Sequence, residues 1–68
     1  MNFRSHEKKE IREALKKGQE VWALDTGTSG NDDHLIGTHQ EVLAEILNYH
    51  EIEELPENWT LDKVDWEI

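Results

Sequence analysis

Apolar residues recur at helical spacing near the start of the chain, where Ile11, Ala14 and Leu15 form a short stripe. Such a stripe is typical of an amphipathic helix that buries one side. Gly18 follows the stripe, and glycine is the usual residue just after a helix because it adopts positive φ at little cost. We therefore expect a first helix over residues 5–17.

The clearest helical pattern begins at Thr38. Thr38 and Glu41 have the spacing of a capping box, in which the hydroxyl accepts from the third helical N–H and the carboxylate accepts from the N-cap N–H. A stripe at helical spacing follows the box. Its residues are Val42, Leu43, Ile46, Leu47 and His50. The pattern predicts a second helix over residues 39–50.

One segment between the two helices has the character of a strand. Successive side chains of a strand point to opposite faces of a sheet. Val21 and Ala23 would therefore share one face, while Trp22 and Leu24 would share the other. Because both faces are apolar, residues 19–26 predict a strand that is central or covered on both sides.

Two further segments predict strands, one from the loop that precedes it and the other from its alternation of apolar and acidic residues. Residues 34–37 follow a loop rich in glycine, asparagine and aspartate, which favours a short strand that pairs back as a hairpin. The end of the chain alternates apolar and acidic side chains, and this period of two predicts a last strand. The alternating residues are Val64, Asp65, Trp66, Glu67 and Ile68.

These elements predict a small single-domain α+β fold over residues 1–68, in the order α-β-β-α-β. We expect a three-stranded sheet with the two helices packed on one face. The chain has no cysteine, so it has neither a disulfide nor a catalytic thiolate. It also shows no apolar run of membrane-spanning length and no secretory signal. We expect a soluble, cytoplasmic protein that does not enter membranes.

Charge is divided unevenly along the chain. Residues 1–17 hold six lysines and arginines against three carboxylates, whereas residues 18–68 hold thirteen carboxylates against Lys63 alone. The formal net charge is -9. An acidic surface of this kind repels nucleic acid and anionic membranes, and it attracts basic partners. We therefore expect no direct binding to nucleic acid.

The segment from Asp25 to Ser29 resembles the catalytic loop of aspartic proteases, in which an apolar strand delivers Asp-Thr-Gly. The resemblance implies an aspartate dyad shared between two subunits, because that chemistry needs two carboxylates and one proton. Only seven residues separate Gly27 from Leu35, which leaves no room for a flap over a substrate. Aspartate, threonine and glycine are also ordinary turn residues. We interpret this segment as a turn and predict that the protein is not an enzyme.

Two other motifs that could bind phosphate or a metal ion are also incomplete. The glycine-containing loop 27–30 lacks the following Gly-Lys-Ser/Thr of a phosphate-binding loop. A zinc site can be drawn from His34 and His39 together with Asp32 and Asp33, but its spacing matches no recognised ligand set. We therefore predict no metal, no cofactor and no catalytic residue.

The carboxylates of the second helix and of the segments after it are the remaining candidate site. A row of carboxylates is a sparse imitation of the phosphates of DNA, which carry one charge per about 1.7 Å of helix axis. Trp59 lies among them and could anchor a partner, since tryptophan is enriched at the centres of interfaces. The predicted partner-binding residues are Glu41, Glu45, Glu51, Glu53, Glu54, Glu57, Trp59, Asp65 and Glu67.

Two functional hypotheses follow from the charge. The first is a regulator or inhibitor whose acidic surface occupies a basic surface of a protein partner, such as an enzyme that binds nucleic acid. In size and composition the chain is similar to the short acidic anti-restriction and anti-CRISPR proteins of phages and mobile elements. The second hypothesis is a self-associating assembly module, in which the basic first helix of one copy meets the acidic segments of another.

Overall fold

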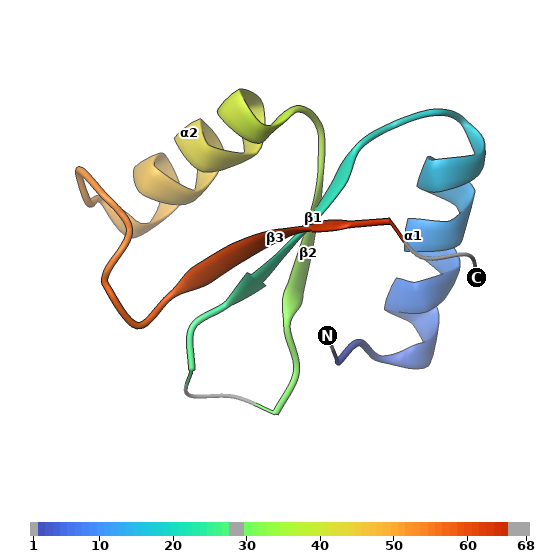
Figure 1. Ribbon diagram of the computed structural model, residues 1–68, viewed down its shortest axis with the longest axis horizontal. Coiled ribbons are helices and arrows are strands. Elements are labelled where there is room, and N and C mark those ends of the chain that lie inside the picture. The colour runs from blue at the N-terminus through green and yellow to red at the C-terminus, as the bar shows by residue number, and fades with distance from the viewer. Residues whose placement is uncertain (1, 28–29, 66–68) are drawn as a thin grey trace.

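The computed structural model describes residues 2–27 and 30–65, and it confirms both the α+β class and the predicted order of elements. Two helices and three strands follow one another in the order α1-β1-β2-α2-β3 (Figure 1). Their bounds are Ser5–Lys16 for α1, Val21–Asp25 for β1, Asp33–Ile36 for β2, His39–His50 for α2 and Thr60–Val64 for β3.

The sheet is antiparallel throughout and has the strand order β2-β1-β3, so β1 is central. Val21 of β1 lies opposite Ile36 of β2 on one side and opposite Val64 of β3 on the other. The central position confirms what the two apolar faces of residues 19–26 predicted. Both β2 and β3 are edge strands of the described sheet.

The first hydrophobic core lies between α1 and one face of the sheet. Ile11 and Ala14 of α1 are buried there against Val21, Ala23 and the edge residue Val64. Three of these side chains, those of Ile11, Val21 and Val64, have no solvent exposure. Phe3, which precedes α1, joins the same core.

The second core lies between α2 and the other face of the sheet. Val42 and Ile46 of α2 pack there with Leu24 of β1, and partly buried residues surround them. Those surrounding residues are Trp22, Leu35, Leu55, Trp59 and Leu61.

The expectation that both helices pack on one face of the sheet is therefore wrong. Val21 and Ala23 of β1 pack with α1, Leu24 packs with α2, and Figure 1 shows the helices on opposite sides of the strands. A strand with two apolar faces must have both faces covered, because exposing either would leave apolar area in water. Each helix supplies one cover.

Local chemistry accounts for where the helices begin and end. The N–H of Gln19 donates to the carbonyl of Ala14 and the N–H of Gly18 to the carbonyl of Leu15, which is the Schellman motif expected at a glycine. The capping box of α2 is formed as predicted: the N–H of Glu41 donates to the Thr38 hydroxyl at 3.2 Å, and the N–H of Thr38 donates to the Glu41 carboxylate at 3.1 Å.

The remaining differences from the predicted elements lie at the strand ends. β1 is shorter than residues 19–26, and the last strand ends at Val64 in the described part of the chain. β3 begins at Thr60, ahead of the alternating segment that predicted it. Trp66, Glu67 and Ile68 lie outside the described residues. Neither described helix has the length or the apolar character that a membrane span needs.

The end of α2 is strained at Glu51. Its backbone is left-handed, with φ of 56°, and it is the one non-glycine residue with positive φ in residues 2–27 and 30–65. The N–H of the next residue, Ile52, donates to the carbonyl of Leu47 at 3.0 Å, as in a Schellman motif. A side chain in this conformation costs about 1 kcal/mol relative to glycine.

We expect Glu51→Gly to raise the free energy of unfolding by about 0.5 kcal/mol, because relief of the backbone strain outweighs the added freedom of the unfolded chain. Urea denaturation followed by tryptophan fluorescence measures the change. Glu53→Gly is the matched control, since Glu53 is exposed, carries the same charge and has no positive φ. The control should leave the free energy of unfolding unchanged or lower it. If both variants raised the free energy of unfolding, the loss of charge and not the relief of strain would be responsible.

Candidate functional site

Six carboxylates of α2 and of the connector between α2 and β3 are exposed. We call this set the acidic surface: Glu41, Glu45, Glu51, Glu53, Glu54 and Glu57. Each is exposed to solvent. Within the described part of the chain, none of these six carboxylates makes an ion pair with a lysine or arginine. Their negative charge therefore faces water.

The basic residues of the chain lie on the other side of the sheet. α1 carries Lys8, Lys9, Arg12 and Lys16, and all four are exposed. Because α1 and α2 cover opposite faces, the sheet separates this basic helix from the acidic surface (Figure 1). Lys63, the single lysine after residue 17, bonds to Glu20 at 3.5 Å instead. The charge asymmetry of the sequence is thus an asymmetry of the folded molecule.

The other predicted partner-binding residues are placed differently. Asp65 is exposed just beyond the end of β3. Glu67 lies outside the described residues. Trp59 is half-buried, packs against the α2 core, and meets the His50 ring edge-on with centroids 4.8 Å apart. Its indole is therefore partly used in folding, and its role as an anchor stays a prediction.

Tyr49 is the exposed aromatic that sequence reasoning missed. It is 80% exposed. It packs edge-on against His50, with centroids 5.0 Å apart. Tyr49 lies seven residues after Val42 and three after Ile46, so helical spacing places it beside the apolar stripe and gave no signal of its exposure.

One member of the acidic surface also has a structural role. Hydrogen bonds from the N–H and the hydroxyl of Thr38 hold the pKa of Glu41 below its ordinary value. The carboxylate at this position therefore stays charged at neutral pH and stabilises the start of α2 at the same time. Its replacement by glutamine removes the charge but keeps a side chain that a capping box accepts.

A cleft of about 750 Å³ lies between α1, β2 and α2. Its charged lining consists of five carboxylates and one guanidinium, those of Glu7, Glu10, Asp32, Asp33, Glu45 and Arg4. His6, His34, His50 and Tyr49 also line it, as do the apolar side chains Leu24, Leu35 and Ile46. No local pattern in the sequence predicted this cleft, because its walls come from segments that are far apart along the chain.

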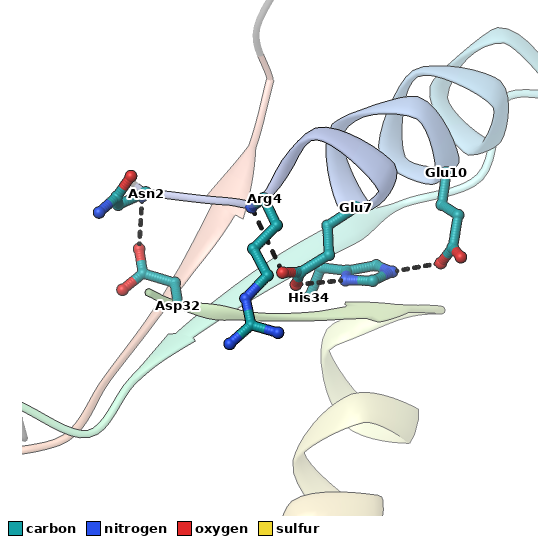
Figure 2. A network of polar contacts seen from close by, with 6 residues as sticks. All are labelled: Asn2, Arg4, Glu7, Glu10, Asp32 and His34. Atoms are coloured by element: carbon teal, nitrogen blue, oxygen red, sulfur yellow. Dashed lines mark hydrogen bonds and ion pairs between the residues drawn. The ribbon is translucent and has the colours of Figure 1, made fainter. Parts of the chain in front are cut away.

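His34 of β2 links this strand to α1 (Figure 2). Its Nδ1 lies 3.2 Å from a carboxylate oxygen of Glu7, and its Nε2 lies 2.8 Å from one of Glu10. A histidine ring donates at both nitrogens only when it is protonated. Burial acts to raise the pKa of Glu7, but hydrogen bonds from His34 and from the N–H of Arg4 outweigh it and hold that pKa below its ordinary value.

The residues considered for metal binding are not brought together. His34 points to α1, whereas the His39 ring packs at a tilt on Trp22 with centroids 4.7 Å apart. Asp32 accepts a hydrogen bond from the N–H of Asn2 at 3.2 Å. Among residues 2–27 and 30–65, no three histidine or acidic side chains are grouped so that they could hold a metal ion.

The segment that resembles the aspartic protease loop has the geometry of a turn at its start. The N–H of Gly27 donates to the Asp25 carboxylate at 2.8 Å, which is the Asx-turn contact typical of this residue type. Gly27 has φ of 78°. Asp25 therefore uses a carboxylate oxygen to hold its own loop.

Comparisons with known proteins found no relative of this chain. No family model, no curated protein and no solved structure matches the chain. The fold and the separation of charge are therefore the basis for any statement on function.

We expect Glu7→Gln to lower the free energy of unfolding at pH 7 by about 1 kcal/mol, the usual scale for a hydrogen bond to a charged group that is partly open to solvent. Because the folded-state pKa of Glu7 is lowered, its contribution is present above the ordinary carboxylate pKa and is lost as the pH falls. Urea denaturation at pH 7 and pH 3 measures the free energy of unfolding of wild type and variant. The difference between the two should be smaller at pH 3 than at pH 7.

The matched control for this prediction is Glu13→Gln. Glu13 lies on the same helix, is exposed, and its side chain makes no hydrogen bond or ion pair within the described residues. This variant should unfold like the wild type at both pH values. A Glu7→Gln deficit that persists undiminished at pH 3 would contradict the account of His34 and Glu7.

Proposed function

We propose that this is a small, non-catalytic binding protein whose acidic surface occupies a basic surface of a protein partner. The observation that carries the proposal is the position of α1 and α2 on opposite faces of the sheet. None of the six carboxylates of the acidic surface forms an ion pair in the described part of the chain, and most lysines and arginines belong to the helix on the other face. A field of one sign steers an oppositely charged partner and speeds association.

The partner class that fits this surface best is an enzyme that handles nucleic acid, because its groove for phosphates already carries the complementary charge. In that case the protein acts as a regulator or inhibitor that competes with nucleic acid. The proposal also places it in the cytoplasm, since a chain without cysteines has no dependence on an oxidising compartment.

A second candidate function is self-association, and the same arrangement favours it. The basic side of one copy, formed by α1, is complementary to the acidic surface of the next copy. Such head-to-tail contacts are heterologous and lead to rings or filaments. Sedimentation of the purified protein separates the two candidates: a monomer at high protein concentration favours the external partner, and a stable oligomer favours assembly.

We expect a variant in which five glutamates become glutamine to lose its partner in an affinity pull-down from host lysate. The positions changed are Glu41, Glu45, Glu51, Glu53 and Glu54. Recovery of the protein that wild type enriches should fall by at least about tenfold, because loss of complementary charge weakens the complex and slows its formation. The purified partner should show the same difference in a direct binding assay, and the difference should shrink at high salt.

The control variant changes five positive charges on the opposite side of the sheet. Lys8, Lys9, Arg12, Lys16 and Lys17 become glutamine, and this variant should keep the partner. Equal recovery by wild type and by the glutamate variant would contradict the proposal. Loss in both variants would show that both sides of the molecule are needed, which favours self-association.

A further inference from the structure

We propose that the outer edge of β2 binds an extended, lysine- or arginine-bearing segment of a protein partner as a fourth strand of the sheet. This inference rests on the proposed function, since it names one place where a basic partner is held. It is carried by three observations: the direction of the backbone groups of β2, the cleft around that edge, and the charge of the cleft walls.

The backbone groups of β2 alternate between β1 and the outer edge. The N–H of Gly37 donates to the carbonyl of Glu20 at 2.8 Å, so residue 37 faces β1. In an antiparallel pair every second residue faces the partner strand. Leu35 and Asp33 therefore also face β1, and the N–H and C=O groups of His34 and Ile36 point away from the sheet.

The chain itself already pairs with this edge at one end. The N–H of Asp32, the next outward-facing position, donates to the carbonyl of Asn2 at 2.8 Å. The side chain of Asn2 also donates to the carbonyl of Gly30. Asn2, three residues ahead of α1, thus occupies the start of the edge, and no strand of the described residues pairs with the part that follows. An unpaired edge of this kind is the template for strand addition.

The cleft passes around this edge from one face of the sheet to the other. His34 lies opposite Ala23 and so belongs to the α1 face, whereas Leu35 lies opposite Trp22 and belongs to the α2 face. Both line the same cleft. Figure 2 shows β2 between α1 and α2, with the side chain of Arg4 reaching down beside it. An incoming strand would lie between the two helices.

The walls of the cleft define the chemistry of the occupant. Five carboxylates line it against the single guanidinium of Arg4. Asp33 and Glu45 are exposed and make no hydrogen bond or ion pair through their side chains in the described part of the chain. The ring of Tyr49, 80% exposed at the rim, offers a face for a cation. Alternate side chains of an extended segment point to one face of the sheet, so alternating cationic side chains would reach Asp33, Glu45 and Tyr49 on the α2 face.

A second copy of this chain fits the edge less well than a basic segment does. Pairing two β2 edges would bring two clefts together, each lined by five carboxylates. Like charges placed opposite one another across a sheet destabilise the pairing. The charge of the cleft thus favours a cationic partner over a dimer formed through this edge.

The test uses a blocked octapeptide of alternating lysine and valine as the probe, with the full-length protein. Fluorescence anisotropy gives the dissociation constant, and amide hydrogen exchange gives the site. We expect the peptide to slow exchange at the N–H groups of His34 and Ile36 and to leave those of α1 unchanged. Slowed exchange spread evenly over α2 and the connector, with none at β2, would overturn the inference.

Two chemically matched probes test strand addition itself. Methylation of alternate backbone amides blocks one edge of the peptide in one version and the opposite edge in the other. We expect one version to bind like the parent and the other to bind at least about tenfold more weakly, because only one edge donates to β2. Equal affinity of the two methylated versions would contradict pairing along the backbone.

Paired charge variants separate this inference from the proposed function. The double variant Asp33→Asn with Glu45→Gln removes two cleft charges, and Glu53→Gln with Glu54→Gln removes two charges away from the cleft. We expect only the first to weaken peptide binding, by about fivefold or more. Equal weakening in both would overturn the cleft site while keeping the acidic surface as the binding surface. A dimer that protects His34 and Ile36 without peptide would overturn the choice of occupant.

Discussion

The central strand β1 must be buried on both of its faces, and this requirement decides where the two helices lie. Val21 and Ala23 are buried on one face and Leu24 on the other, and neither face can be left in water. Two helices are needed, one for each face. Since α1 is basic and α2 is acidic, this packing requirement also divides the charge of the molecule.

The same constraint creates the cleft and the free edge beside it. Because the helices lie on opposite faces, the outer edge of β2 lies between them. Two helices on one face would instead have left the other face of the sheet exposed to water. His34 shows the connection between packing and charge: it belongs to the strand, lies 3.2 Å and 2.8 Å from two carboxylates of α1, and lines the cleft. Stability and the candidate binding site thus share residues.

Elements whose ends are set by neighbouring residues could be predicted from the sequence. The capping box at Thr38 and Glu41 gave the start of α2, and Gly18 gave the end of α1, because both rest on hydrogen bonds within a few residues. The left-handed residue after α2 is a glutamate, so no glycine signalled it.

Features that depend on long-range packing could not be predicted in this way. The periodicity of β1 showed that both faces would be covered, but it could not say which element covers which face. The exposed carboxylates of the acidic surface were foreseen from composition and helical spacing. The cleft was not, since its walls join Arg4, His34 and Glu45, which no sequence pattern links.

In the folded protein, the sheet separates the lysines and arginine of α1 from the acidic surface. Paramagnetic relaxation of amide protons by a cationic and by an anionic nitroxide cosolute measures the local potential at each residue. We expect the cationic probe to relax amides of α2 and the connector more strongly, and the anionic probe to have its largest relative effect on α1. A ratio of the two effects that is uniform along the chain would contradict this separation of charge.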